Sequence, residues 1–203
     1  INLMPNVGTY YANRAAAYSS LGQFADAVSD CQHALRLDPT SGKVYKRLAR
    51  AYGEQGDFAK MHAALQEGLS KSGGSDTALR TELDQAARLV AWEAEGSAAL
   101  RNGDCSLART FFANMLSHTS APSIRLKLVK AELGLGLCDR ALRTTRDVIK
   151  THPNISEAYT LRGLALLFSA DLDQAQKHLR EALRGLHPDV QALEQAQASA
   201  APR

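Results

Sequence analysis

The chain has 203 residues, of which 45% are hydrophobic and 22% are charged, a mixture typical of folded rather than disordered proteins. The formal net charge of +3 is too small to indicate nucleic-acid binding, and no apolar run approaches the roughly 18 residues that a membrane span needs. Three cysteines, Cys31, Cys105 and Cys138, are too few for a disulfide scaffold and favour a reducing compartment, so we expect a cytoplasmic protein.

The N-terminal third of the chain repeats with a period of 34 residues. The positions that recur at this spacing are Tyr11, Tyr18, Gly22 and Phe24, which return as Tyr45, Tyr52, Gly56 and Phe58. Each unit predicts two helices. In the first unit the second helix covers residues 24–37, where apolar side chains recur at helical spacing and Asp38-Pro39 ends the run. A glycine at position 22 predicts the turn between the two helices.

A break follows at residues 73–75, and the next predicted helix is unusually long. Asp76 is placed to cap a helix that runs unbroken to about Arg101. The last part of this helix opens a third unit, whose markers are Trp92, Gly96, Gly103, Ala108 and Phe112. Residues 76–88 are therefore extra helix. The acidic residues of the long helix fit a solvated face; they are Glu82, Asp84, Glu93 and Glu95.

Two looser units complete the pattern. The fourth unit carries Gly136, Ala141 and Pro153, and its first helix is predicted to be short, from Ser123 to about Leu135. The fifth unit carries Tyr159, Gly163, Ala175, Ala182 and Leu183, with Ala170 where a turn glycine is expected. Because residues 1–6 resemble residues 35–40, and a further helix is predicted at 190–198, we expect the sequence to begin and end inside repeats.

These features resemble the tetratricopeptide repeat. Residues 8–41 match its signature at Tyr11, Ala15, Tyr18, Gly22, Phe24, Ala27, Ala34 and Pro39. The resemblance implies an all-α fold, a tetratricopeptide-repeat solenoid in which helix pairs form a right-handed superhelix with a concave binding surface. We expect one array over residues 1–203. Its parts are the end of an upstream repeat at 1–7, repeats at 8–41 and 42–72, an extended helix plus repeat at 73–121, repeats at 122–153 and 155–188, and the start of a further helix at 189–203.

The order of the units narrows the resemblance further. Two clear repeats, a long fused helix and three looser repeats are similar to cytosolic cochaperones that carry such an array ahead of a C-terminal J domain. The stretches that carry this similarity are residues 10–16, 130–132 and 159–164. The resemblance implies a non-enzymatic chaperone adaptor with no cofactor, metal site or catalytic residue.

Side chains of the first two repeats are candidates for peptide binding. In clamp-type arrays, Asn and Lys or Arg from successive first helices bind the C-terminal Glu-Glu-Val-Asp carboxylates of the 70- and 90-kDa heat-shock chaperones. Asn13, Lys43 and Arg47 match positions of that clamp, and the two cations, four residues apart, share a helical face. Lys46 and Arg50 are expected to add positive potential. The same residues also fit a solvated helix surface, but their register across two repeats favours binding.

Two other functions stay open. One is a client-binding array for unfolded apolar segments, as in related lumenal cochaperones, and the other is a general protein-assembly scaffold. The clamp residues argue against the first. The tripeptide His187-Pro188-Asp189 matches the signature of a J domain, but only fourteen residues follow it, and its surroundings favour the end of a repeat.

Overall fold

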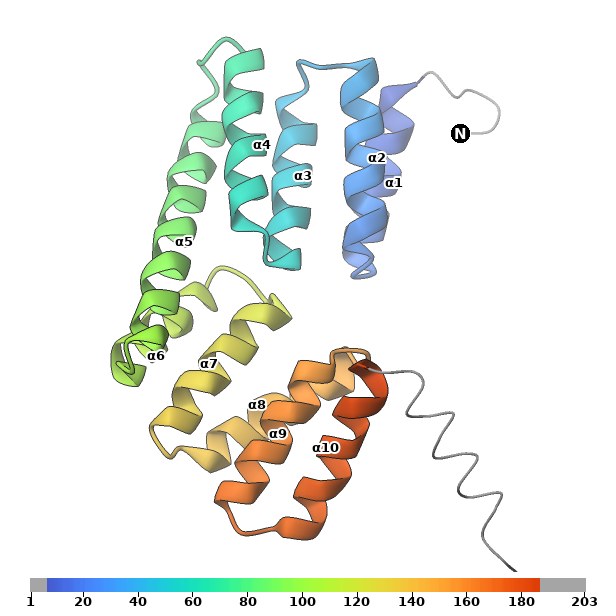
Figure 1. The fold of residues 1–203 in the computed structure, drawn as a ribbon. Helices are drawn as coiled ribbons and strands as arrows, with labels where there is room; N and C mark the ends of the chain where they lie inside the picture. Colours follow the sequence, from blue (N-terminus) through green and yellow to red (C-terminus); the bar gives the residue numbers. More distant parts are fainter. Residues whose placement is uncertain (1–6, 187–203) are drawn as a thin grey trace, which may run out of the picture. The chain divides into compact units, whose positions relative to one another are not determined.

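A computed structural model describes residues 7–186, and every regular element in that range is an α-helix. The helices, shown in Figure 1, are α1 (Gly8–Ser20), α2 (Phe24–Leu37), α3 (Gly42–Gln55), α4 (Phe58–Lys71), α5 (Thr77–Arg101), α6 (Cys105–Met115), α7 (Pro122–Gly134), α8 (Cys138–Thr151), α9 (Ser156–Phe168) and α10 (Leu172–Leu186). The all-α prediction is confirmed. The interpretations placed on residues 1–6 and 187–203, including His187-Pro188-Asp189, lie outside the described residues.

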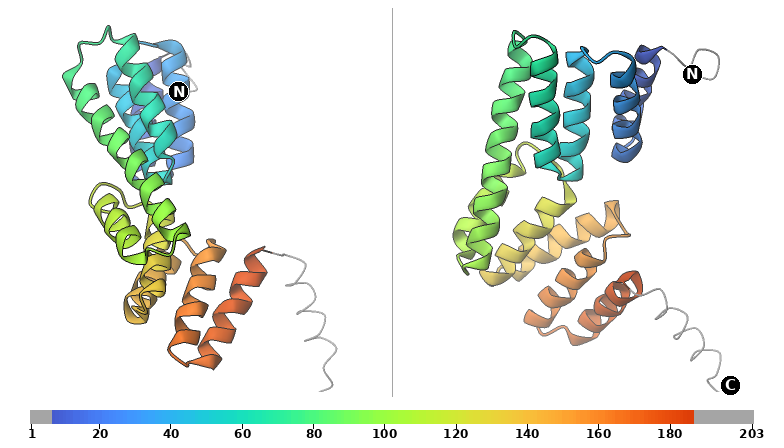
Figure 2. Two further views of the ribbon diagram at one scale, coloured as in Figure 1. Left: turned by 60° about the vertical axis from the view of Figure 1, so that its left-hand side comes forward. Right: turned by 45° about the horizontal axis from the view of Figure 1, so that its top comes forward.

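The helices pack as consecutive pairs. Helix α1 packs on α2, α3 on α4, α7 on α8 and α9 on α10, and the pairs are visible in Figures 1 and 2. The second helix of the first unit, predicted at residues 24–37, has those bounds. Gly22 takes the left-handed conformation at the turn, with φ +74°, which a residue without a side chain adopts at little cost. The pairing of helices follows the repeat pattern, and the proposed repeat boundaries stay predictions.

The fifth turn departs from glycine. Ala170 has φ +60° and is the one described residue other than glycine with a positive φ. This turn is nevertheless closed by the same hydrogen bond as the turn of the first repeat. The Asp171 amide donates to the Leu166 carbonyl at 3.0 Å, and in the first repeat the Gln23 amide donates to the Tyr18 carbonyl at 2.9 Å. The repeat geometry therefore holds alanine in a conformation that costs about 1–2 kcal/mol.

The long helix is confirmed. Asp76 caps α5 as predicted, because its Oδ1 accepts the amides of Ala78 at 2.9 Å and Leu79 at 3.0 Å. The first half of α5 then packs on the first two repeats, with Leu79 and Ala86 fully buried. The extra helical segment therefore packs against α3 and α4 and belongs to the core of the first two repeats.

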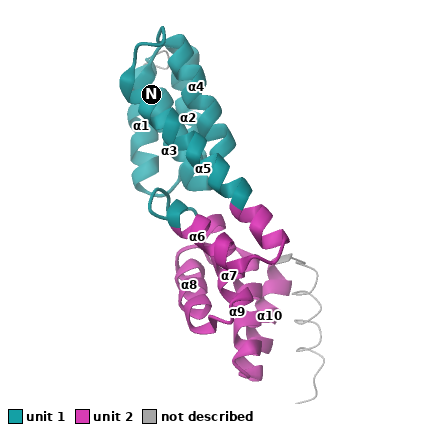
Figure 3. Cartoon of the chain, turned by 90° about the vertical axis from the view of Figure 1, so that its left-hand side faces the viewer, with its two compact units in different colours: residues 1–95, 114–121 teal, residues 96–113, 122–203 magenta. Residues whose placement is uncertain are grey.

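The chain divides into two compact units, coloured in Figure 3. The first contains residues 1–95 and 114–121, and the second contains residues 96–113 and 122–203, so α5 and α6 contribute to both. The core of the first unit includes Tyr11, Ala15, Cys31, Tyr45, Leu48, Leu65, Leu79 and Ala86. None of the helices in the described range combines the length and the apolar character that a membrane crossing requires.

The first and the fifth repeat share an arginine contact. In the first, Arg14 on α1 donates two bonds to Asp30 on α2, at 2.6 and 2.7 Å. In the fifth, Arg162 on α9 takes the equivalent position, and its Nε donates to His178 Nε2 on α10 at 3.1 Å. The same backbone therefore supports a charged pair in one repeat and a cation beside an uncharged acceptor in the other.

Candidate functional site

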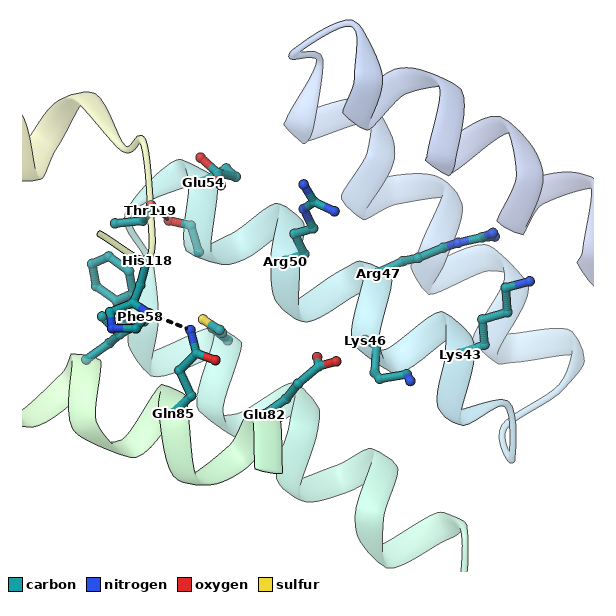
Figure 4. A pocket seen from close by; sticks show the side chains of 13 residues that line it. Lys43, Lys46, Arg47, Arg50, Glu54, Phe58, Glu82, Gln85, His118 and Thr119 are labelled. Atoms are coloured by element: carbon teal, nitrogen blue, oxygen red, sulfur yellow. Dashed lines mark hydrogen bonds between the residues drawn. The ribbon is translucent and has the colours of Figure 1, made fainter. Parts of the chain in front are cut away.

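Helix α3 presents a cationic face. Because residues three and four apart share one side of a helix, Lys43, Lys46, Arg47 and Arg50 line up on the side of α3 away from the buried Tyr45 and Ala49. All four cations line a cleft of about 510 Å³ in the first unit (Figure 4). The other lining residues are Gly53 and Glu54 of α3, Phe58 and Met61 of α4, Glu82, Gln85 and Leu89 of α5, and His118 and Thr119 of the loop after α6.

One end of this cleft is closed by the loop at residues 116–121. Thr119 Oγ1 donates to the Gly53 carbonyl at 3.0 Å, and Ser120 donates to Glu54 Oε2 from its amide at 3.1 Å and from its hydroxyl at 2.5 Å. His118 is held from α5, because its Nδ1 lies 3.1 Å from Gln85 Nε2. The loop is therefore fastened to the C-terminal end of α3, and the cations lie toward the other end.

A smaller cleft of about 380 Å³ brings the three clamp candidates together. Asn13 of α1 and Lys43 and Arg47 of α3 all line it, and Asn13 and Lys43 are exposed. Arg47 Nη1 also donates to the Ala12 carbonyl at 2.6 Å, which ties α3 to α1 and orients the guanidinium. Lys43 and Arg47 line both clefts, Lys46 and Arg50 line the larger one, and Asn13 lines the smaller one.

The cations of the clefts have few partners of their own. Among the described residues, Lys43, Lys46 and Arg50 form no ion pair within 4.0 Å, and the one hydrogen bond of Arg47 is to a carbonyl. Arg14 shows the contrast. It follows Asn13 in the sequence but pairs with Asp30, and that hydrogen bond is the main cause of its raised pKa. The cleft thus gathers cations that form no salt bridge with any residue in the described part of the chain.

Glu82 corrects the sequence-based interpretation of the long helix. The acidic residues of α5 were expected on a solvated face, and Asp84 and Glu95 are indeed exposed, but Glu82 is half-buried and lines the larger cleft. A signal for this was present in the sequence. Glu82 shares the inward stripe with Leu79 and Ala86, which lie three residues before it and four after it and are both fully buried.

The closed end of the cleft had no such signal. Thr119 and Ser120 contact α3 residues that are 66 positions earlier in the chain, and nothing in the local pattern pairs the two segments. Within residues 7–186, no three His, Cys, Asp or Glu side chains come together as a metal site requires.

Comparison with known proteins identifies the class of this fold. Two segments, residues 9–41 and 156–184, match the tetratricopeptide repeat family. Together with the helix pairs described above, these matches show that the chain contains tetratricopeptide repeats, as its sequence pattern indicated. The crystal structure of the P58(IPK) TPR domain shares the fold, with a TM-score of 0.73 and 17% identity over 94% of this chain and 55% of that one.

Particular relatives extend the similarity over most of the chain. The DnaJ homologue subfamily C member 7 of Mus musculus is 26% identical over 93% of this chain and 38% of its own length. A homologue of the same protein in Schizosaccharomyces pombe is 28% identical over 89% of this chain and 31% of its own length. The chain is thus homologous to these DnaJ proteins, and it spans about a third of their length.

Proposed function

We propose that the chain is a non-enzymatic chaperone adaptor whose first two repeats capture the acidic carboxyl-terminal tails of 70- and 90-kDa heat-shock chaperones. The observation that carries this proposal is the convergence of Lys43, Lys46, Arg47 and Arg50 on clefts in which no described carboxylate pairs with Lys43, Lys46 or Arg50. The homology to DnaJ proteins supports a place beside those chaperones.

The two clefts offer different groups to such a tail. At the smaller one, the Asn13 amide and the Lys43 and Arg47 cations provide the convergent donors that a chain-end carboxylate needs. Along the larger one, Lys46 and Arg50 extend positive potential for preceding acidic side chains. This partition follows from which residues line each cleft.

Calorimetry with the 203-residue chain tests the proposal. A peptide ending in Glu-Glu-Val-Asp is expected to bind, and Lys43→Ala and Asn13→Ala are each expected to weaken it roughly fivefold to fiftyfold, as the loss of a charge-assisted bond implies. Arg88→Ala is the matched control, because Arg88 is an exposed cation of α5 that lines neither cleft. Equal affinities for the wild type and both cleft variants contradict the assignment.

The proposal places the protein in the cytoplasm. The cochaperones that the sequence resembles are cytosolic, and the cytosol keeps thiols reduced. Cys31, Cys105 and Cys138 are all free thiols in the structure, which supports this location.

A second candidate function is binding of unfolded apolar segments. The observation that favours it is a group of exposed apolar side chains where α9 meets α10, including Phe168 at 69% and Leu172 at 65% exposure. Such a surface fits apolar ligands better than acidic ones. If this function holds, the chain suppresses aggregation of a denatured protein, and the double change Phe168→Ser and Leu172→Ser removes that activity while tail binding persists.

A further inference from the structure

The larger cleft contains a carboxylate that faces its cations and forms no hydrogen bond or salt bridge with a described residue. Glu82 projects from α5 toward the side of α3 that carries Lys46 and Arg50 (Figure 4). In the described part of the chain, Glu82 accepts no hydrogen bond and forms no ion pair within 4.0 Å. The Glu82 carboxylate therefore does not hold two elements together through a hydrogen bond or a salt bridge, as a structural carboxylate does.

Glu54 shows what a structural carboxylate in this cleft looks like. It is the other acidic residue of the lining, and its Oε2 accepts two bonds from Ser120 that fasten the closing loop. Removing the Glu54 carboxylate breaks both of its bonds to Ser120 and weakens the attachment of the loop that closes the cleft. Removing the Glu82 charge breaks no bond among the described residues, so its effect on a ligand is separable from any effect on the fold.

Charges act on Glu82 from several elements. Burial raises the pKa of Glu82, and Asp76 at the start of α5 acts in the same direction. Lys46 and Arg50 of α3 lower it. The carboxylate and the two cations thus interact across the cleft at distances longer than a salt bridge, in a partly desolvated space where such interactions are stronger than in water.

We propose that Glu82 is an internal competitor of the anionic ligand that limits how tightly the cleft binds. This inference rests on the proposed function of the cleft. In the empty cleft, Glu82 offsets part of the positive potential of Lys46 and Arg50. A ligand carboxylate that approaches these cations meets a negative charge on the facing helix, so the tail binds less tightly and exchanges more readily than the cations alone would allow.

The test compares Glu82→Gln with the wild type by calorimetry, using the peptide that ends in Glu-Glu-Val-Asp. The variant keeps the size of the side chain and removes its charge, and it is expected to bind roughly three- to tenfold tighter, with a steeper loss of affinity as salt is added. Glu82→Lys is expected to bind tighter still. Asp84→Asn is the matched control, since it removes a carboxylate from the same helix two residues away, at an exposed position outside the cleft lining.

The outcomes separate this inference from the function on which it rests. Tighter binding by Glu82→Gln, with Asp84→Asn within twofold of the wild type, supports the competitor role. A wild type that binds the peptide with the same affinity as Glu82→Gln overturns the role of Glu82 and leaves the tail-binding proposal standing. Absence of binding by the wild type and by both Glu82 variants, all with the same helical circular-dichroism signal, overturns both.

Discussion

Substituting Gly68 by alanine is expected to destabilise the first compact unit, although helix propensity alone favours alanine over glycine. Gly68 lies on α4, and a Cβ built on it would come within 2.6 Å of Cγ and 2.9 Å of Cδ2 in the ring of Tyr45 on α3. Real carbon contacts are about 3.5–4.0 Å, so the two helices would have to separate or the ring would have to turn. The ring has little freedom, because Tyr45 is 2% exposed and its hydroxyl donates to Glu67 at 3.0 Å.

The magnitude follows from two opposing terms. Overpacking of a filled core costs about 1–3 kcal/mol, and the clash here is with a buried, tethered ring, which places it in the upper half of that range. Replacing glycine by alanine inside a helix returns about 0.5–1 kcal/mol. The net expectation for Gly68→Ala is a loss of about 1–2.5 kcal/mol in the free energy of unfolding, or a thermal midpoint lower by roughly 2–10 °C.

Urea unfolding followed by circular dichroism measures this loss, and Gly53→Ala is the matched control. Gly53 is also buried and helical, on α3, but its added Cβ would meet the sulfur of Met61 at 3.0 Å, which is near the end of a flexible side chain. The control is expected to stay within about 0.5 kcal/mol of the wild type. If Gly68→Ala is as stable as the wild type, or more so, helix propensity outweighs the close approach of α3 and α4, and the reasoning is wrong.

Three further results are expected from the same structure. Ala170→Gly relieves the left-handed strain of the fifth turn and should raise the free energy of unfolding by up to about 1 kcal/mol in urea titrations, after the greater freedom of glycine in the unfolded chain is subtracted. Burial, the largest cause, lowers the pKa of His178 below its ordinary value of 6.5, so the unfolded chain takes up the proton first. Stability is therefore present above pH 6.5 and decreases as the pH falls toward the folded pKa, and the thermal midpoints should show this. Burial also raises the pKa of Cys31 to about 11, so in the native protein a thiol reagent should modify the half-buried Cys105 and Cys138 before Cys31.

A specific outcome would contradict each of these three predictions. A glycine at position 170 that lowers stability means that the turn holds alanine without strain. A His178→Gln variant with the same decline in stability between pH 7.5 and 5.5 as the wild type assigns that decline to other groups. Modification of all three thiols at one rate in the native state means that Cys31 is reached by solvent despite its burial.

The local signals of the sequence were sufficient for the helix pairs. Residues 24–37 form a helix with the expected bounds because apolar spacing, a preceding turn glycine and a following Asp-Pro all act within a few positions. The cap at Asp76 was equally readable, since it depends on side chains and amides only two and three residues away. Such elements depend on interactions between residues only a few positions apart, and these can be read from a single sequence.

The candidate site was only partly readable. The register that placed Asn13, Lys43 and Arg47 on successive first helices also places them on one cleft in the structure, whereas their role in binding stays a proposal. The closing loop was missed, because the hydrogen bond of Thr119 Oγ1 to the Gly53 carbonyl joins segments that lie 66 residues apart, and no local pattern predicts such a contact. Glu82 was misjudged because charge was weighed above its position on a buried stripe.

The bond between Arg47 and the Ala12 carbonyl gives this side chain a structural role beside its proposed role in binding a tail. A guanidinium carries five donor hydrogens in a rigid fork, so one of them can hold the neighbouring repeat while the rest remain directed at an anion. A lysine has one nitrogen on a flexible stem and would have to divide it between the two. Under the proposed function, binding of a tail at Arg47 and packing of α1 against α3 are therefore thermodynamically coupled. Occupation of the cleft should slow amide hydrogen exchange in both helices, and loosening their contact should weaken the grip on the tail.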